Sequence, residues 1–232
     1  MGKRSFKDIN SFNTIKIIIE GIFSLIFDCG QVCIICEEES PENELLCSEC
    51  SKKIKYCYDI NLVSINNQVL SYYSVSYYSG IMKELILHLK YKSDFRAGEF
   101  IANKMVDLIK KSHLDFDIIT YVPSGKEALK VRGYNQSECI AKYVGRKMGK
   151  KVYCLLKKGK ETKDQIGLGK EMRWDNLVDS FQIANSNLII NSNILLIDDV
   201  ITTGATAFLC SKVLKETGAR SVKVLTAAKS SI

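Results

Sequence analysis

The chain has 232 residues, of which 46% are hydrophobic and 25% charged, a composition typical of a folded globular protein with one core and a small appendage. Its formal net charge of +7 favours anionic partners such as phosphates, nucleotides or nucleic acid, although such a charge can also serve solubility alone. The apolar run at residues 15–27 is too short to span a membrane, contains Lys16 and Glu20, and lacks a following cleavage site. We therefore expect an amphipathic helix there, no stable membrane insertion and a cytoplasmic protein, with a peripheral membrane or partner contact as the alternative.

The first part of the chain is rich in cysteine, with six of the nine cysteines between residues 29 and 57. Two C-x2-C pairs stand ten residues apart, formed by Cys33, Cys36, Cys47 and Cys50. Cytoplasmic proteins rarely keep disulfides, so the paired spacing predicts four thiolate ligands for zinc. A closed four-thiolate set leaves no open position and indicates a structural role. Free buried cysteines are the alternative, but they do not explain the spacing.

Alternating strand and helix patterns follow the cysteines. We expect a first domain at residues 1–66, with the N-terminal helix and zinc element, and a second domain at 67–232. The expected strands lie at 69–78 (a strand or hairpin), 118–122, 152–156, 194–197 and 222–225, and the expected helices at 81–91, 97–111, 136–148 and 205–216. This alternation predicts an α/β fold in which helices flank a parallel sheet. The polar segment at residues 157–174 has no clear period and is expected to form a mobile loop.

The most informative segment, residues 194–206, reads I-L-L-I-D-D-V-I-T-T-G-A-T. A buried strand ends here in Asp198 and Asp199, and a small-residue turn then leads into a helix. Backbone N–H groups of such a turn can bind a phosphate, aided by the positive end of the helix. The candidate ligand-binding residues are Asp198, Asp199, Val200, Thr202, Thr203, Gly204, Ala205 and Thr206. Paired acids after a strand can alternatively hold a metal, and the segment is neither a Walker A loop nor a G-x-G-x-x-G fingerprint.

Residues 194–206 resemble the phosphoribosyl pyrophosphate motif of type I phosphoribosyltransferases. The resemblance implies that the two aspartates hold the ribose hydroxyls and that the following loop holds the 5′-phosphate. It also implies a magnesium ion that bridges the pyrophosphate and the ribose hydroxyls.

Further motifs narrow the resemblance to the ComF competence family over about residues 23–229. They are the cysteine pairs, L-I-L-H-L-K-Y at 85–91, R-G-Y-N-Q at 132–136, and the series Thr162, Gln165, Leu168, Arg173, Asn176 and Phe181. Members of this family join an N-terminal zinc element to a phosphoribosyltransferase domain. The resemblance implies a role in DNA uptake, with single-stranded DNA and competence proteins as partners.

Two more segments resemble parts of a phosphoribosyltransferase site. Residues 121–135 look like the pyrophosphate loop, in which Ser124, Gly125, Lys126 and Arg132 would contact the pyrophosphate. Tyr121 departs from the family, since a proline is usual there. Residues 157–176 look like the flexible hood, which would bring Lys163 or Arg173 near the leaving group. A surface ion pair for Arg132 and an ordinary solvated loop are the alternatives.

Two functions follow from these features. The first is a phosphoribosyltransferase that displaces pyrophosphate at the anomeric carbon, with an unknown acceptor and with Asp198, Asp199, Arg132 and Arg173 as candidate catalytic residues. The second is a non-catalytic protein that responds to phosphoribosyl pyrophosphate and acts as a single-stranded DNA-binding or adaptor protein. We expect both histidines, His88 and His113, to be structural or exposed, so no general base for an acceptor is evident.

Overall fold

The computed structural model describes residues 32–41, 44–65, 68–159 and 180–230, and it divides the chain into two compact units, Met1–Lys52 and Lys53–Ile232. The amphipathic helix predicted at residues 15–27 lies outside the described residues. The domain boundary predicted after residue 66 stays a prediction. Within the described ranges, no helix is both long and apolar enough to cross a membrane.

The described part of the first unit consists of tight turns and one short helix, α2 (Ser48–Lys52). In the first turn the backbone N–H of Cys33 donates to the carbonyl of Glu38 at 2.8 Å, and that of Glu37 donates back to Cys33 at 3.0 Å. In the second, Ser51 N–H donates to the Cys47 carbonyl at 3.0 Å. Each cysteine pair is therefore carried by a turn that its own backbone hydrogen bonds hold in place.

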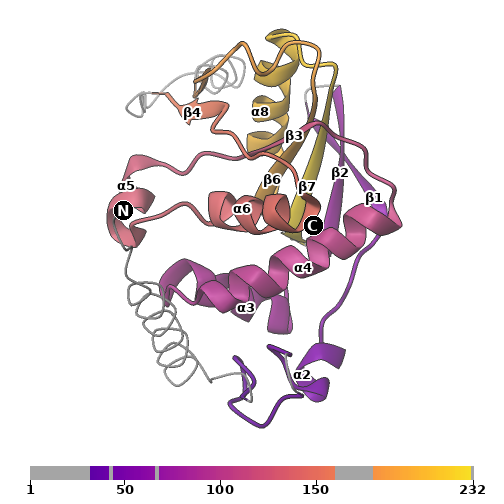
Figure 1. Cartoon of the computed structure of the whole chain (residues 1–232), viewed down its shortest axis with the longest axis vertical. Helices are drawn as coiled ribbons and strands as arrows, with labels where there is room; N and C mark the ends of the chain where they lie inside the picture. Colours follow the sequence, from indigo (N-terminus) through magenta and orange to yellow (C-terminus); the bar gives the residue numbers. More distant parts are fainter. Residues whose placement is uncertain (1–31, 42–43, 66–67, 160–179, 231–232) are drawn as a thin grey trace, which may run out of the picture. The chain divides into compact units, whose positions relative to one another are not determined.

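A five-stranded sheet with the order β1-β2-β7-β6-β3 forms the centre of the second unit (Figure 1). Its strands are β1 (Ile60–Ile65), β2 (Gln68–Tyr77), β3 (Ile118–Tyr121), β6 (Asn193–Ile201) and β7 (Ser221–Lys229). Strands β2, β7, β6 and β3 run parallel, whereas β1 pairs antiparallel with β2 at the edge. A separate two-stranded ribbon joins β4 (Leu156–Lys158) to β5 (Phe181–Ile183).

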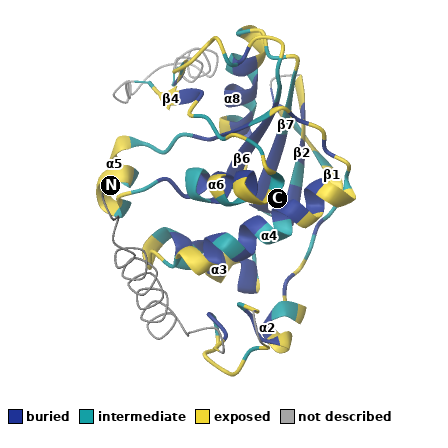
Figure 2. Ribbon diagram, in the orientation of Figure 1, coloured by how far each residue is buried: buried dark blue, intermediate teal, exposed yellow. Residues whose placement is uncertain are grey.

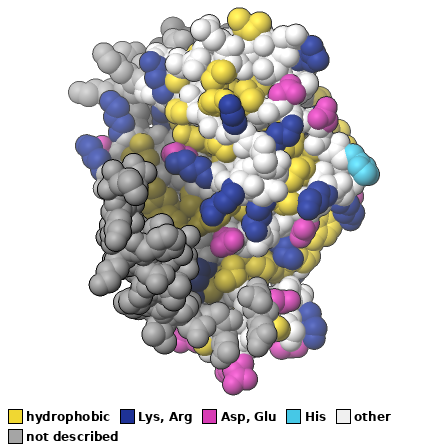
Figure 3. Space-filling view, viewed as in Figure 1, with side chains coloured by type: hydrophobic (Ala, Val, Ile, Leu, Met, Phe, Trp, Pro, Cys, Tyr) yellow, Lys and Arg dark blue, Asp and Glu magenta, His cyan; other side chains and the backbone are white. Residues whose placement is uncertain are grey.

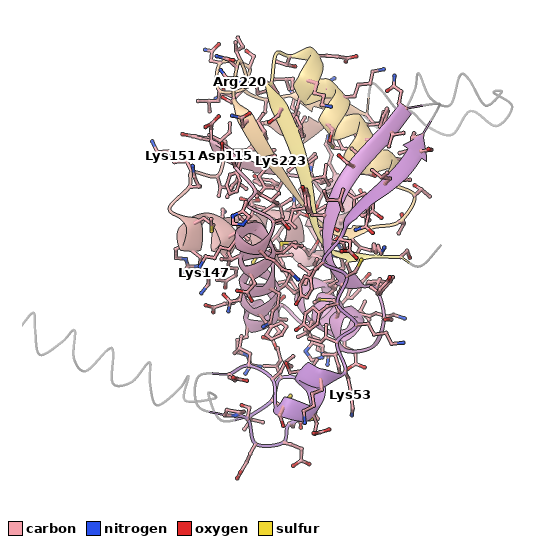
Figure 4. All side chains as sticks on the ribbon, turned by 90° about the vertical axis from the view of Figure 1, so that its right-hand side faces the viewer. Lys53, Asp115, Lys147, Lys151, Arg220 and Lys223 are labelled. Carbon is pink, nitrogen blue, oxygen red and sulfur yellow. The ribbon has the colours of Figure 1, made fainter. Side chains whose placement is uncertain are left out.

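Helices cover both faces of this sheet, as the edge-on view shows (Figure 4). They are α3 (Gly80–Tyr91), α4 (Phe95–Lys111), α6 (Gln136–Met148) and α8 (Ala205–Glu216), whereas the short helix α5 (Lys126–Arg132) has no buried residue and lies away from the sheet (Figure 1). On one face, Leu209 and Leu214 of α8 share a core cluster with Leu196 and Val224. Helices α4 and α6 contact the sheet from the other side.

Burial explains why β6 reads as an uninterrupted apolar run. Residues Ile194 to Ile197 are all 0% exposed, because a central parallel strand is covered on both faces (Figure 2). The predicted architecture, a mainly parallel sheet flanked by helices with a small cysteine element ahead of it, is confirmed.

Most element predictions agree with the structure, and the helices at 136–148 and 205–216 have the predicted bounds. The strand predicted at 152–156 is wrong for most of its length, since Val152 makes only an isolated bridge to Ile119 and β4 begins at Leu156. Strand β6 continues past Ile197 to Ile201, so both aspartates lie within it. Strand β1 was not predicted, because apolar residues on both of its faces hide the alternation that marks a strand. The short helix α5 was not predicted either.

Candidate functional site

The acidic pair lies near the carboxyl end of β6, the edge at which α/β sheets bind ligands. Asp198 is buried, and its Oδ1 accepts hydrogen bonds from Ser137 Oγ at 2.9 Å and from the backbone N–H of Asp199 at 2.9 Å. Ser137 lies in the first turn of α6, which follows the R-G-Y-N-Q segment. The carboxylate of Asp198 is therefore fixed from two sides.

Asp199 has different partners, as expected for neighbouring residues of a strand, whose side chains alternate between faces. Its Oδ2 lies 2.6 Å from Nζ of Lys90 on α3, and its Oδ1 accepts from the backbone N–H of Val200 at 2.6 Å. Both side chains of the ion pair are largely buried, with 18% of Lys90 and 13% of Asp199 exposed. Lys90 thus brings a positive charge to the acidic pair from a distant part of the sequence.

The two carboxylates are electrostatically distinct. Burial and the neighbouring charge of Asp199 raise the pKa of Asp198 to about 7, although its hydrogen bond with Ser137 lowers it. A buried acid beside a second acid favours its neutral form, since each ionised group disfavours the other. Asp198 therefore titrates near neutral pH, where it can accept or donate a hydrogen bond.

An open pocket with about 250 Å³ of empty space adjoins this strand end. Its lining consists of Asp198, Val200, Ile201, Thr202, Thr203, Gly204, Ala205, Thr206 and Ala207. Within the described part of the chain, Asp198 thus lines the pocket whereas Asp199 does not. The structure therefore brings one predicted acid together with the whole predicted turn.

Gly204 is required by both backbone conformation and space. It caps the N-terminus of α8 with φ 79°, a left-handed conformation that favours glycine. A Cβ atom at this position would lie 2.7 Å from Cγ1 of Val63 on β1. The turn therefore packs directly against the edge strand, and α8 begins with its N–H groups at the pocket.

The predicted pyrophosphate loop is partly helical. Gly125 is the N-cap of α5 and Lys126 its first residue, and Ser124 precedes them. None of these three residues lines the pocket in the part of the chain that the structure describes. Their contact with a ligand stays a prediction.

Arg132 is not among the described residues that line the pocket, and its partners lie on α3 and α6. Its guanidinium donates to Gln136 Oε1 at 3.0 Å and to Tyr91 Oη at 3.4 Å, and it lies 5.1 Å from the centroid of the Tyr91 ring. The following Tyr134 hydroxyl donates to the carbonyl of Leu89. The R-G-Y-N-Q segment is therefore fastened to the last turn of α3.

Asn135 explains how the same segment starts the next helix. Its Oδ1 accepts from the backbone N–H groups of Ser137 at 3.0 Å and Glu138 at 3.4 Å, as an N-cap does. Its Nδ2 donates to the carbonyl of Val122 at 2.9 Å. This cap places Ser137 beside Asp198.

The remaining predicted residues of the hood, including Lys163 and Arg173, lie in the range 160–179, outside the described residues. Lys90 and Ser137 were not singled out from the sequence. Lys90 belongs to the L-I-L-H-L-K-Y motif, which supports the family resemblance but does not indicate what the lysine does. No sequence signal marks Ser137, because its partner is 61 residues away in the chain.

The four predicted cysteine ligands come together in the first unit, where their Sγ atoms all lie within 4.8 Å of one another. The Cys36 and Cys47 sulfurs are 3.5 Å apart. A tetrahedral zinc ion with sulfur ligands at about 2.3 Å places those sulfurs about 3.8 Å apart. The cluster therefore fits a zinc ion in size and ligand type.

The thiols of this cluster are electrostatically unequal. Burial opposes ionisation of Cys33, but backbone N–H groups of Cys36, Cys47 and Ile35 outweigh it and lower the pKa of Cys33 to about 6. Burial and the neighbouring thiols raise the pKa of Cys50. Because the four sulfurs are close together, each ionised thiolate disfavours ionisation of the others. A bound cation would stabilise all four thiolates.

Lys and Arg side chains are spread over the face seen in Figure 3. On the side shown in Figure 4, several already have protein partners. Lys223 Nζ donates to the Asp115 carbonyl at 2.7 Å, and Arg220 Nε donates to Asn191 Oδ1 at 2.9 Å. A single-stranded DNA partner stays a prediction.

Two curated proteins align with most of the chain. The competence protein ComFC of Streptococcus pneumoniae is 26% identical over 95% of this chain and 94% of its own length. That of Bacillus subtilis is 24% identical over 82% of this chain and 73% of its own length. No family model matches the chain.

Among solved structures, the chain is similar to the glutamine phosphoribosylpyrophosphate amidotransferase from B. subtilis. The likeness has a TM-score of 0.41 and 18% identity, and it covers 56% of this chain and 26% of the other. So distant a likeness adds no weight to an assignment of function. The two curated relatives, in contrast, confirm that the chain resembles the ComF competence proteins along most of its length.

Proposed function

We propose that the chain binds phosphoribosyl pyrophosphate in the pocket at the end of β6. The observation that carries this proposal is the joint lining of one pocket by Asp198 and the turn from Thr202 to Thr206. Backbone N–H groups at the start of α8 would hold the 5′-phosphate, helped by the positive end of a twelve-residue helix. Asp198 would hydrogen-bond a ribose hydroxyl.

Asp199 lies next to Asp198, but its side chain is paired with Lys90. We propose that Asp199 accepts a hydrogen bond from the second ribose hydroxyl when the ligand is bound. Magnesium would accompany the ligand and neutralise the pyrophosphate charge. Ser124, Gly125, Lys126, Arg132 and Arg173 are the candidate pyrophosphate contacts. Arg132 already donates to Gln136 and Tyr91, so a contact with the pyrophosphate would compete with these partners or use its remaining N–H groups.

The names of the curated relatives support a role in competence, and thus in DNA uptake. A second function, a non-catalytic responder to phosphoribosyl pyrophosphate, is favoured by the engagement of Arg132 outside the pocket. The zinc element would then be a structural part of the first unit, through which that unit contacts a partner.

Calorimetric titration of the chain with phosphoribosyl pyrophosphate and magnesium tests the binding site. We expect binding that is lost in the variant D198A/D199A and retained in D115A, whose exposed acid lies away from the pocket. No binding by the unaltered chain, or equal binding by both variants, would refute the site.

Release of pyrophosphate separates the enzyme from the binding protein. The chain is incubated with phosphoribosyl pyrophosphate, magnesium and a panel of bases and amines, and the pyrophosphate formed is measured. Turnover with one acceptor that D198A/D199A abolishes would establish an enzyme. Tight binding without turnover for any acceptor would favour the responder.

A further inference from the structure

Three consecutive residues at the end of α3 contact two parts of the proposed site, the R-G-Y-N-Q segment and Asp199 of β6. The Leu89 carbonyl accepts from the Tyr134 hydroxyl, and the Tyr91 hydroxyl and ring contact Arg132. Between them, Lys90 forms the ion pair with Asp199 at 2.6 Å. The last turn of α3 is thus anchored on both sides of Lys90, so the ammonium group is delivered to a defined position.

The surroundings of the acidic pair make Lys90 an important charge. Asp198 and Asp199 are adjacent and largely buried, and two uncharged groups among the described residues, the Ser137 hydroxyl and the Cys210 thiol, also lie near Asp198. With its side chain 18% exposed, Lys90 acts through a poorly screened medium. Without it, the recorded side-chain contacts of Asp199 in the described part of the chain would include no cation to offset its charge.

A divalent cation and an ammonium group would compete for the same carboxylate oxygens. The Lys90 ammonium already satisfies Asp199 Oδ2, and the Val200 N–H satisfies Oδ1. A magnesium ion at Asp199 would have to displace the Lys90 ammonium or bind beside its positive charge, which lies 2.6 Å from Oδ2, and magnesium also gives up its waters reluctantly. Free magnesium therefore has little to gain at Asp199.

Resting on the proposed function, we propose that Lys90 is the built-in counter-cation of the acidic pair: it positions Asp199 and keeps free divalent cations off the two aspartates. Magnesium then enters the site with the pyrophosphate of the ligand. The sugar and 5′-phosphate are recognised without magnesium, since the Lys90 ammonium already offsets the charge of Asp199. Lys90 is a positioning residue, because it acts on the ligand through Asp199.

Manganese binding tests the charge role without any sugar ligand. Free Mn²⁺ is followed by electron paramagnetic resonance in titrations of the zinc-loaded chain and of K90M, K90R and K90M/D199N. We expect K90M to gain one Mn²⁺ site that the unaltered chain, K90R and K90M/D199N lack. Absence of a new site in folded K90M, or a site already present in the unaltered chain, would overturn the proposal.

Ribose 5-phosphate tests the role in ligand binding, because it carries the sugar and the 5′-phosphate but no pyrophosphate. In EDTA we expect the unaltered chain to bind it as well as in magnesium, K90M to bind it about tenfold or more weakly, and K90R to stay within about threefold. Magnesium should partly restore K90M. Equal binding by K90M and the unaltered chain in EDTA would overturn the positioning role.

The two titrations separate this inference from the proposed function. If the unaltered chain binds neither ribose 5-phosphate nor phosphoribosyl pyrophosphate, the proposed function fails, whereas a new Mn²⁺ site in K90M still supports the counter-cation. If the unaltered chain binds both ligands and K90M behaves like it in both titrations, the counter-cation fails and the proposed function stands. Thermal unfolding of K90M and K90R establishes that each variant is folded.

Discussion

The two candidate sites of the molecule draw their residues from the sequence in different ways. The cysteine cluster takes all four ligands from residues 33–50, and its own turns hold them. The pocket at the end of β6 also has a contiguous lining, but distant residues set the charge of its acids, Lys90 on α3 and Ser137 on α6. The first site is closed and self-contained, whereas the second is open and depends on the packing of the whole second unit.

The cysteine cluster should show the largest effect, since a structural zinc ion contributes about 10–16 kcal/mol in small zinc elements. We expect one zinc per chain after purification in reductant, and its loss in C47S. Mass spectrometry of the metal content checks this, with C154S as the control because Cys154 is exposed and outside the cluster. Zinc-free unaltered chain with an ordered cysteine element would contradict the self-contained site.

The next effect concerns the buried acid. The pKa of Asp198 is about 7 in the folded chain, above its value of about 4 when unfolded, so the folded state binds the extra proton. This contribution to stability is present below about pH 4 and is lost as the pH rises through about 7.

The variant D198N keeps a neutral side chain at every pH. We expect it to be more stable than the unaltered chain by roughly 2–4 kcal/mol at about pH 8, and nearly equal to it at about pH 4. Urea unfolding at both pH values measures the difference. The same difference at both pH values would show that the pKa of Asp198 is the same in the folded and the unfolded chain, so that its burial beside Asp199 does not raise it.

Sequence patterns predicted the turn after β6 and the pairing of the four cysteines because each set is contiguous or regularly spaced. The same patterns could not reveal that Asp199 faces Lys90 while Asp198 faces the pocket, since that depends on how α3 packs against β6. They also did not predict β1, whose Val63 lies so close to Gly204 that a Cβ atom there would be 2.7 Å from Val63 Cγ1. Side chains that pair across long stretches of sequence form no regular spacing from which their contact could be predicted.

Gly204 measures how tightly the pocket turn is built into the fold. We expect G204A to cost about 2–3 kcal/mol, since it combines a strained left-handed backbone with a contact of 2.7 Å to Val63. The control G149A has the same backbone strain, with φ 63°, but no described atom within 4 Å of the new Cβ, and should cost about 1 kcal/mol. Urea unfolding compares them, and equal costs would show that β1 does not brace the turn.

Ser137 should give the smallest effect. Removal of its hydroxyl in S137A takes one hydrogen bond from buried Asp198 and should cost about 1–2 kcal/mol. The matched control is S211A, because the buried Ser211 hydroxyl has no hydrogen-bond partner among the described residues. S211A should be neutral or stabilising in the same unfolding measurement. Equal losses in both variants would show that Ser137 does not hold Asp198.

A crystal structure of the chain with phosphoribosyl pyrophosphate and magnesium tests the central claim most directly. We predict the 5′-phosphate at the start of α8, accepting hydrogen bonds from backbone N–H groups of residues 203–206, and a ribose hydroxyl at the Asp198 carboxylate. A ligand bound elsewhere, or one whose 5′-phosphate makes no contact with the Thr202–Thr206 turn, would contradict the claim.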